Sequence, residues 1–154
     1  MKPDGTVVDF SIYQNKVLLI VNTASACGFT PQYQELEKLY QQYKGEGLEI
    51  LAFPSNDFGQ QEQLSGEALQ RYCALDQRLS FTVFDRIQIK GADAHPIYQF
   101  LRDKSLNGKV SSKPLWNFHK YLIDREGKVV DYFYSFTKPL ARRLEKKVKK
   151  LLEA

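Results

Sequence analysis

The chain has 154 residues, of which 43% are hydrophobic and 26% are charged, and its 22 Lys and Arg against 18 Asp and Glu leave a formal charge of +4. This composition supports a packed core and excludes intrinsic disorder, so we expect one domain over residues 1–154. The basic excess is confined to the C-terminal region, so no nucleic-acid partner is expected. The longest apolar run, residues 17–21, is too short to cross a bilayer and no secretory signal segment is visible, so we expect a cytoplasmic protein without integral membrane association.

The first third of the chain predicts a strand, a helix and a second strand. Residues 16–22 and 48–53 are short apolar runs of the kind found in strands that are buried on both faces. Pro31 is expected to open the helix between them, and the glycines that follow Lys44 are expected to end it. The apolar positions of this helix recur at helical spacing and are Leu36, Leu39, Tyr40 and Tyr43. A βαβ unit of this kind pairs its two strands in parallel.

The middle of the chain predicts a polar loop over residues 54–63 and two further helices. Ser65 is expected to cap the first helix and Pro96 to begin the second. The side chains at helical spacing, which we expect to face the core, are Leu69, Tyr72 and Cys73 in the first helix and Ile97, Phe100 and Leu101 in the second. Residues 107–114 then form a loop of small, polar and basic side chains.

The last third predicts a hairpin and a terminal helix. Residues 121–123 and 129–133 flank a turn over residues 124–127 that ends in glycine, which is typical of two antiparallel strands. The terminal helix has an apolar face made of Leu140, Leu144, Val148, Leu151 and Leu152. A parallel half and an antiparallel half together indicate an α/β fold with a central mixed β-sheet flanked by helices.

The chain has two cysteines, Cys27 and Cys73, and two histidines, His95 and His119. Their spacing does not match a zinc site, and two cysteines are few for a small secreted fold held by disulfides. We expect no metal and no other cofactor. His95 is interpreted as the start of a helix, and His119 as an exposed residue of a strand. The cysteines are either two inert buried thiols or a redox pair.

Cys27 lies after a predicted strand and just before a predicted helix. In a βαβ unit this loop is at the carboxyl end of the strand, where α/β proteins bind ligands, and the N-terminus of the following helix favours a thiolate. A small residue tolerated in a tight loop is the alternative, and position alone does not decide between them. A peroxidase would also need uncharged N–H donors around the sulfur, of the kind that Gln, Asn and Trp supply.

Three segments resemble the glutathione peroxidase family. Residues 22–30 read NTASACGFT, residues 53–62 read FPSNDFGQQE and residues 116–120 read WNFHK. They occur in the family's order, and the similarity runs over nearly the whole chain. The resemblance implies a thioredoxin-like fold and the reduction of hydrogen peroxide and of organic or lipid hydroperoxides.

The resemblance also implies a role for five residues. Cys27 matches the peroxidatic position, and Gln61, Trp116 and Asn117 match the other members of the family's catalytic tetrad. Cys73 matches the resolving cysteine of the two-cysteine branch, which generally takes electrons from thioredoxin. The hypothesis is that Cys27 becomes a sulfenic acid, that Cys73 converts it into a disulfide, and that thioredoxin reduces the disulfide. Glutathione is the less favoured reductant.

Some features depart from the family pattern or leave alternatives open. The unusual residues are Asp57, Gln63, Leu64, Thr82 and Leu115, and the turn at Asp4 and Gly5 leaves the family's N-terminal hairpin shortened. The brief segment over residues 107–114 is similar to that of monomeric members. The same residues would serve a peroxide sensor that passes its disulfide to a partner protein, and a glutathione-dependent peroxidase would use Cys27 alone.

Overall fold

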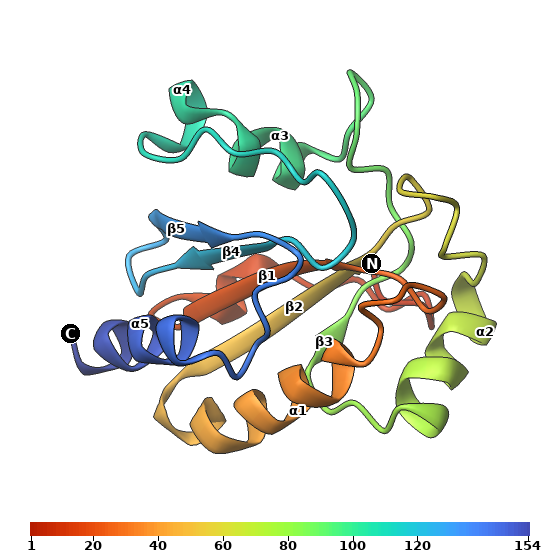
Figure 1. Ribbon diagram of the computed structural model, residues 1–154, viewed down its shortest axis with the longest axis horizontal. Helices are drawn as coiled ribbons and strands as arrows, with labels where there is room; N and C mark the ends of the chain where they lie inside the picture. Colours follow the sequence, from red (N-terminus) through yellow and green to blue (C-terminus); the bar gives the residue numbers. More distant parts are fainter.

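The computed structural model describes residues 1–154, and its centre is a five-stranded mixed sheet with the strand order β3-β2-β1-β4-β5 (Figure 1). The strands are β1 (Val17–Thr23), β2 (Leu48–Pro54), β3 (Thr82–Val83), β4 (Lys120–Ile123) and β5 (Val129–Phe133). The α-helices are α1 (Gln32–Tyr43), α2 (Gly66–Arg71), α3 (Pro96–Arg102), α4 (Lys104–Asn107) and α5 (Arg142–Glu153). Short helical turns cover Phe10–Tyr13, Lys44–Glu46 and Tyr72–Asp76.

The predicted halves of the sheet are confirmed. The strands β1 and β2 pair in parallel across the α1 crossover, and β3 adds a further parallel strand to β2. The strand β4 runs antiparallel to β1 and forms the predicted hairpin with β5. The carboxyl ends of β1 and β2 therefore lie at one end of the sheet, together with the start of β4.

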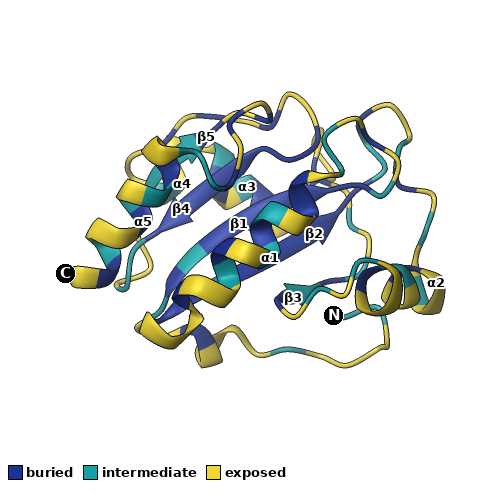
Figure 2. Ribbon diagram, turned by 60° about the horizontal axis from the view of Figure 1, so that its bottom comes forward, coloured by how far each residue is buried: buried dark blue, intermediate teal, exposed yellow.

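The sheet is buried on both faces. Successive residues of β1 point to opposite sides of the sheet, so the strand contributes side chains to a core on each face. Leu19 and Val21 face α1 and α5, where they pack in one core cluster with Leu36 and Val148. Ile20 belongs to the other cluster, which contains side chains of α3. Figure 2 shows buried strands behind helices whose outer surfaces are exposed, and none of the helices is long and apolar enough to span a bilayer.

Two local expectations need correction, and two further features are noted. Phe100 is exposed, whereas Tyr98 and Leu101 are the buried residues of α3, because this short helix turns a different face to the sheet. Ser65 precedes α2 but makes no side-chain capping hydrogen bond. A two-residue strand, β3, and the short helix α4 were not predicted, since neither has a recognisable pattern of its own. The Asp4–Gly5 turn is present without flanking strands, in agreement with the shortened N-terminal hairpin expected from the sequence.

Candidate active site

Cys27 lies in the loop that joins the carboxyl end of β1 to α1, and its side chain is almost fully buried. The backbone N–H of Phe29 donates to the Cys27 Sγ atom at 3.3 Å. The Thr30 hydroxyl braces this loop, because it accepts from the Cys27 N–H at 2.9 Å and donates to the Ala24 carbonyl at 2.9 Å. The sulfur is therefore fixed before the first turn of α1 with a backbone donor directed at it, as a nucleophilic thiolate requires.

Gln61 and Asn117 meet beside this loop although they are 56 positions apart. The Asn117 Nδ2 atom donates to Gln61 Oε1 at 3.0 Å and to the Phe58 carbonyl at 3.3 Å. The Gln61 carbonyl accepts from the backbone N–H of Ala26 at 3.0 Å, one residue before Cys27. The fold thus ties the two amides to the Cys27 loop.

Trp116 is placed by Asn22, the residue that precedes the end of β1. The Asn22 Nδ2 atom donates to the Trp116 carbonyl at 3.0 Å, and the Phe118 N–H donates to the Asn22 carbonyl at 2.6 Å. The indole lies against Gly59, where an added Cβ would be 2.7 Å from the indole Cη2 atom, and Gly59 has a φ of +65°. Glycine is therefore required at this position both for its backbone conformation and for the close approach of the ring.

Cys73 lies on the π-helical turn Tyr72–Asp76 and is also almost fully buried. Burial, and then the negative charge of Glu62, raise the pKa of the Cys73 thiol to about 12. The Tyr72 hydroxyl donates to the Ser25 carbonyl at 3.3 Å and so ties the turn to the Cys27 loop. Both cysteines are free thiols, as in a reduced protein.

Comparison with known proteins identifies the family. Residues 1–102 match the family model described as glutathione peroxidase. A glutathione peroxidase of Lactococcus lactis subsp. cremoris is 46% identical over 152 residues, which cover 99% of this chain and 95% of the relative. The chain belongs to the glutathione peroxidase family. A probable phospholipid hydroperoxide glutathione peroxidase of Mesembryanthemum crystallinum is 47% identical over 149 residues, 96% of this chain and 86% of that relative.

Membership of the glutathione peroxidase family confirms the resemblance predicted from the three sequence segments. It makes the protein an oxidoreductase of the peroxidase class that acts on hydroperoxides. A thiol:disulfide interchange protein of the thioredoxin family from Chlorobium tepidum TLS shares the architecture, with a TM-score of 0.70 over 99% of this chain and 90% of that chain. At 12% identity this likeness concerns the fold alone, and it confirms the predicted thioredoxin-like fold.

A groove of about 810 Å³ opens beside Trp116. Its lining includes Asp57, Gly59, Lys90, Arg102, Lys113 and Trp116. Asp57, which departs from the family pattern, has a structural task here. Its carboxylate accepts from the backbone N–H groups of Ile89 at 2.6 Å and Lys90 at 2.9 Å, so it holds one wall of the groove in place.

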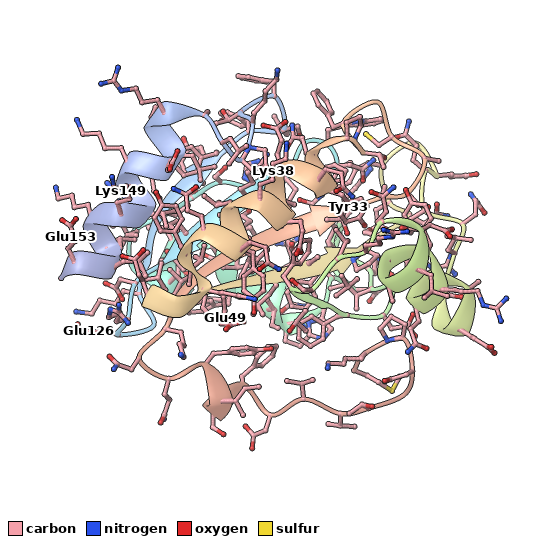
Figure 3. All side chains as sticks on the ribbon, turned by 90° about the horizontal axis from the view of Figure 1, so that it is seen from below. Tyr33, Lys38, Glu49, Glu126, Lys149 and Glu153 are labelled. Atoms are coloured by element: carbon pink, nitrogen blue, oxygen red, sulfur yellow. The ribbon has the colours of Figure 1, made fainter.

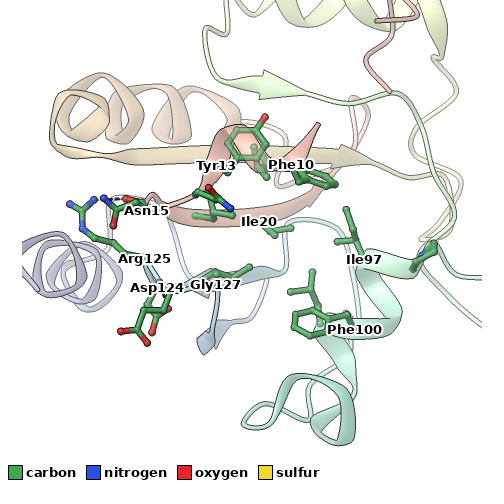
Figure 4. Close-up of a pocket in the computed structure, with 16 residues that line it drawn as sticks. Phe10, Tyr13, Asn15, Ile20, Ile97, Phe100, Asp124, Arg125 and Gly127 are labelled. Atoms are coloured by element: carbon green, nitrogen blue, oxygen red, sulfur yellow. Dashed lines mark hydrogen bonds between the residues drawn. The ribbon is translucent and has the colours of Figure 1, made fainter. Parts of the chain in front are cut away.

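A second pocket lies at the other end of β1 and is separate from this site (Figure 4). It has a volume of about 570 Å³ and a mostly apolar lining that includes Phe10, Leu18, Ile97 and Phe100. None of the five predicted site residues lines it, and it contains no thiol. It therefore plays no part in the chemistry considered below.

His119 is fully buried, which corrects the expectation of an exposed strand residue. Its Nε2 atom lies 3.3 Å from the Ser112 Oγ atom, and its ring packs against Tyr121 and Tyr132. Burial lowers the pKa of His119 to about 4, so the ring is neutral at physiological pH. A neutral histidine within an aromatic cluster is interpreted as a packing residue.

Sequence analysis missed three residues that shape the site, namely Thr30, Tyr33 and Glu62. Thr30 and Glu62 belong to the segments that resemble the family, but nothing in those segments indicates a buried carboxylate. The Glu62 carboxylate accepts from the Ser25 hydroxyl, which is remote in sequence. Only the position of Glu62 directly after Gln61 could have drawn attention to it.

Proposed function

We propose that this protein is a two-cysteine thiol peroxidase in which a hydroperoxide oxidises Cys27, Cys73 converts the product into a disulfide, and thioredoxin restores both thiols. The observation that carries this proposal is the pairing of Asn117 with Gln61, whose backbone carbonyl accepts from the N–H of Ala26, the residue before Cys27. A buried cysteine without such donors could react with peroxide only slowly, because charge on the departing oxygen would be unsupported.

In the first step the Cys27 thiolate attacks the terminal oxygen of the hydroperoxide. An S–O bond forms, the O–O bond breaks, and the departing oxygen takes up a proton to leave as an alcohol or water. Sulfur loses two electrons to the peroxide and becomes a sulfenic acid. The N–H groups of Gln61 and Trp116 would stabilise the thiolate and the charge that develops on the departing oxygen, and Asn117, which donates to Gln61 Oε1 and to the Phe58 carbonyl, would orient the Gln61 amide for this role.

In the second step Cys73 attacks the sulfenic sulfur. An S–S bond forms, the S–O bond breaks, and hydroxide combines with the thiol proton and leaves as water. The two thiols of reduced thioredoxin then exchange with the Cys27–Cys73 disulfide, so that thioredoxin is oxidised and both cysteines are reduced. The hydrogen bond from Tyr72 to Ser25 supports this pairing, because it joins the Cys73 turn to the Cys27 loop.

The substrate range should extend beyond hydrogen peroxide. The groove beside Trp116 is large enough for part of an organic or lipid hydroperoxide. The Mesembryanthemum relative is named for phospholipid hydroperoxide, which supports the same assignment. We further propose that the protein acts as a monomer in the cytoplasm, which light scattering and cell fractionation would test.

An NADPH-coupled assay tests the proposal directly. Hydrogen peroxide and cumene hydroperoxide are supplied with thioredoxin and its reductase, or with glutathione and its reductase, to the wild type, Cys27→Ser and Cys73→Ser. We expect turnover with thioredoxin that either substitution abolishes. Turnover with glutathione that survives Cys73→Ser would assign the chemistry to Cys27 alone. If the disulfide forms but is reduced only after one specific partner protein is added, the protein is a peroxide sensor.

A further inference from the structure

Lys120, the first residue of β4, is fully buried although its side chain carries an ionisable amine. None of the three ion pairs in the structure includes it. Burial lowers the pKa of Lys120 to about 7, and the negative charge of Glu35 opposes this shift. A buried lysine without an ion-pair partner is costly in free energy, so its presence calls for an explanation beyond packing.

The Lys120 amine is directed at backbone carbonyl groups. Its Nζ atom donates to the Phe118 carbonyl at 2.7 Å and reaches the Ser135 carbonyl at 3.5 Å. The Ser135 carbonyl also accepts from Nε2 of Gln32, the first residue of α1, at 2.7 Å. Both the ammonium and the neutral amine have N–H groups that can donate, so the contact with Phe118 does not depend on the charge of Lys120.

Phe118 has a backbone conformation that residues other than glycine rarely adopt, with a φ of +66°. Its N–H donates to the carbonyl of Asn22 in β1 at 2.6 Å. Its ring packs edge-on against Tyr33 in the first turn of α1, with 5.3 Å between the ring centroids (Figure 3). A left-handed conformation of this kind persists only where the surroundings hold it, and Lys120 holds the remaining polar group, the carbonyl.

The conformation of Phe118 matters because this residue directly follows Trp116 and Asn117. The Asn117 Nδ2 atom donates to Gln61 Oε1 at 3.0 Å, and the indole of Trp116 lies against Gly59. A change of Phe118 to a negative φ would turn the chain in a different direction at this point. Both contacts would then lengthen, because the two side chains come from the residues just before the turn.

We propose that Lys120 is a positioning residue for the peroxidase reaction, which holds the Phe118 carbonyl and so fixes the left-handed turn that places Trp116 and Asn117 in the candidate active site. The only hydrogen bonds of its side chain are to the carbonyls of Phe118 and Ser135, so it acts through the backbone rather than on the reacting atoms. The inference rests on the proposed function for the reaction that it supports.

Lys120→Met tests the proposal, because methionine keeps an unbranched side chain and removes the donor. The first readout is the NMR signal of the Asn117 side-chain amide, which reports its hydrogen bond to Gln61. The second is the rate constant for Cys27 oxidation by hydrogen peroxide, measured by stopped-flow mixing. We expect the amide signal to shift and the rate constant to fall by about tenfold to 10²-fold.

The stability of Lys120→Met separates positioning from packing. Removal of a buried charge offsets the lost hydrogen bond, so we expect its urea midpoint to stay close to that of the wild type. Lys128→Met is the matched control, because it removes an exposed lysine of the same hairpin that pairs with Glu126 at 3.1 Å. This control should leave the amide signal and the rate constant unchanged.

Two results would count against different proposals. A folded Lys120→Met protein with an unchanged Asn117 amide signal, or with the rate constant of the wild type, would overturn the positioning role. A wild type that does not react with peroxide would overturn the proposed function instead. The amide signal would still test the role of Lys120 in that case, because it is measured without peroxide and without a reductant.

A measurement on the wild type covers the case in which Lys120→Met fails to fold. NMR detects a scalar coupling across a hydrogen bond, here between 15Nζ of Lys120 and the carbonyl 13C of Phe118. We expect this coupling to be present and the amine protons to exchange slowly with water, since the amine is fully buried. Fast exchange without a coupling would show that Lys120 does not hold Phe118 and would refute the proposal.

Discussion

The two cysteines of this protein are almost equally buried, at 7% exposure for Cys27 and 4% for Cys73, yet the local structure around them differs. Cys27 sits in a loop braced by Thr30, with a backbone N–H directed at its sulfur. Cys73 lies on a π-helical turn, where burial raises the pKa of its thiol. Equal burial of the two cysteines therefore does not imply equal thiol chemistry, because a backbone donor is directed at the sulfur of Cys27.

The two segments also differ in how they are held. The Cys27 loop is fixed between β1 and α1, which both belong to the main core. The Cys73 turn follows a six-residue helix, and its closing bonds run from Gln77 N–H to the Tyr72 carbonyl and from Leu79 N–H to the Cys73 carbonyl, both at 2.9 Å. A π-helical turn after so short a helix is expected to open at low cost in free energy, as a resolving cysteine requires.

The largest expected effect concerns the polar groups near Cys27. Asn117→Ala removes the donor to Gln61 and Phe58, and we expect the second-order rate constant for Cys27 oxidation to fall by about 10²–10³-fold. Stopped-flow mixing with hydrogen peroxide measures it. Asn107→Ala is the matched control, because Asn107 donates to carbonyls such as that of Val110. It should reduce stability and leave the rate unchanged, and an equal loss in both variants would contradict the assignment.

Gly59→Ala tests the close approach of Trp116. The new methyl group would meet the indole at 2.7 Å in a left-handed backbone conformation, so we expect a loss of about 1–3 kcal/mol in the free energy of unfolding together with slower peroxide reduction. Urea denaturation and stopped-flow kinetics measure the two effects. Gly127→Ala, with a φ of +81° and open space around it, should reduce stability without slowing the reaction.

The raised pKa of Cys73 makes stability depend on pH. An unfolded thiol releases its proton above a pH of about 9 while the folded thiol keeps its proton up to about 12, so the unfolded state is favoured as pH rises through this window. The Cys27→Ser variant is compared with the double variant Cys27→Ser/Cys73→Ala, which lacks the Cys73 thiol. Between pH 9 and pH 10 the free energy of unfolding of Cys27→Ser should fall by about 1 kcal/mol relative to the double variant. Urea midpoints at both pH values measure this difference, and parallel stabilities would show that Cys73 titrates normally.

The smallest effect concerns the link between the two segments. Tyr72→Phe removes the bond to the Ser25 carbonyl and the bond from Gln77 Nε2, so we expect a loss of about 0.5–1.5 kcal/mol and faster hydrogen exchange at residues 72–76. Tyr98→Phe is a suitable control, since the buried Tyr98 hydroxyl has no partner and its removal should not destabilise the protein. Unchanged exchange in Tyr72→Phe would show that other contacts hold the turn.

The main elements could be predicted from the sequence because their signals are local. The apolar runs of β1 and β2 and the stripe that contains Leu144 and Val148 each lie within one segment, and the turn over residues 124–127 marks its own hairpin. The family segments predicted catalytic roles for Gln61 and Asn117, and the fold brings their side chains within hydrogen-bond distance of each other, while the roles themselves stay predictions.

The residues that could not be predicted are those whose surroundings come from distant parts of the chain. His119 was expected at the surface because nothing in its own segment shows that Ser112 and Tyr132 enclose it. The prediction placed Phe100 in the core, whereas the structure buries Tyr98, because a seven-residue helix has too few turns for its buried face to be assigned from the sequence. Glu62 was missed because the burial of a carboxylate is a property of its neighbours in space.

Trp116 is the single tryptophan of the chain, and its indole rests on Gly59 beside the groove. All tryptophan fluorescence of the molecule therefore originates within the candidate active site. A hydroperoxide that enters this groove would change the dipoles around the ring and its access to water. The protein thus carries an intrinsic optical probe that can report on the proposed reaction without any added label.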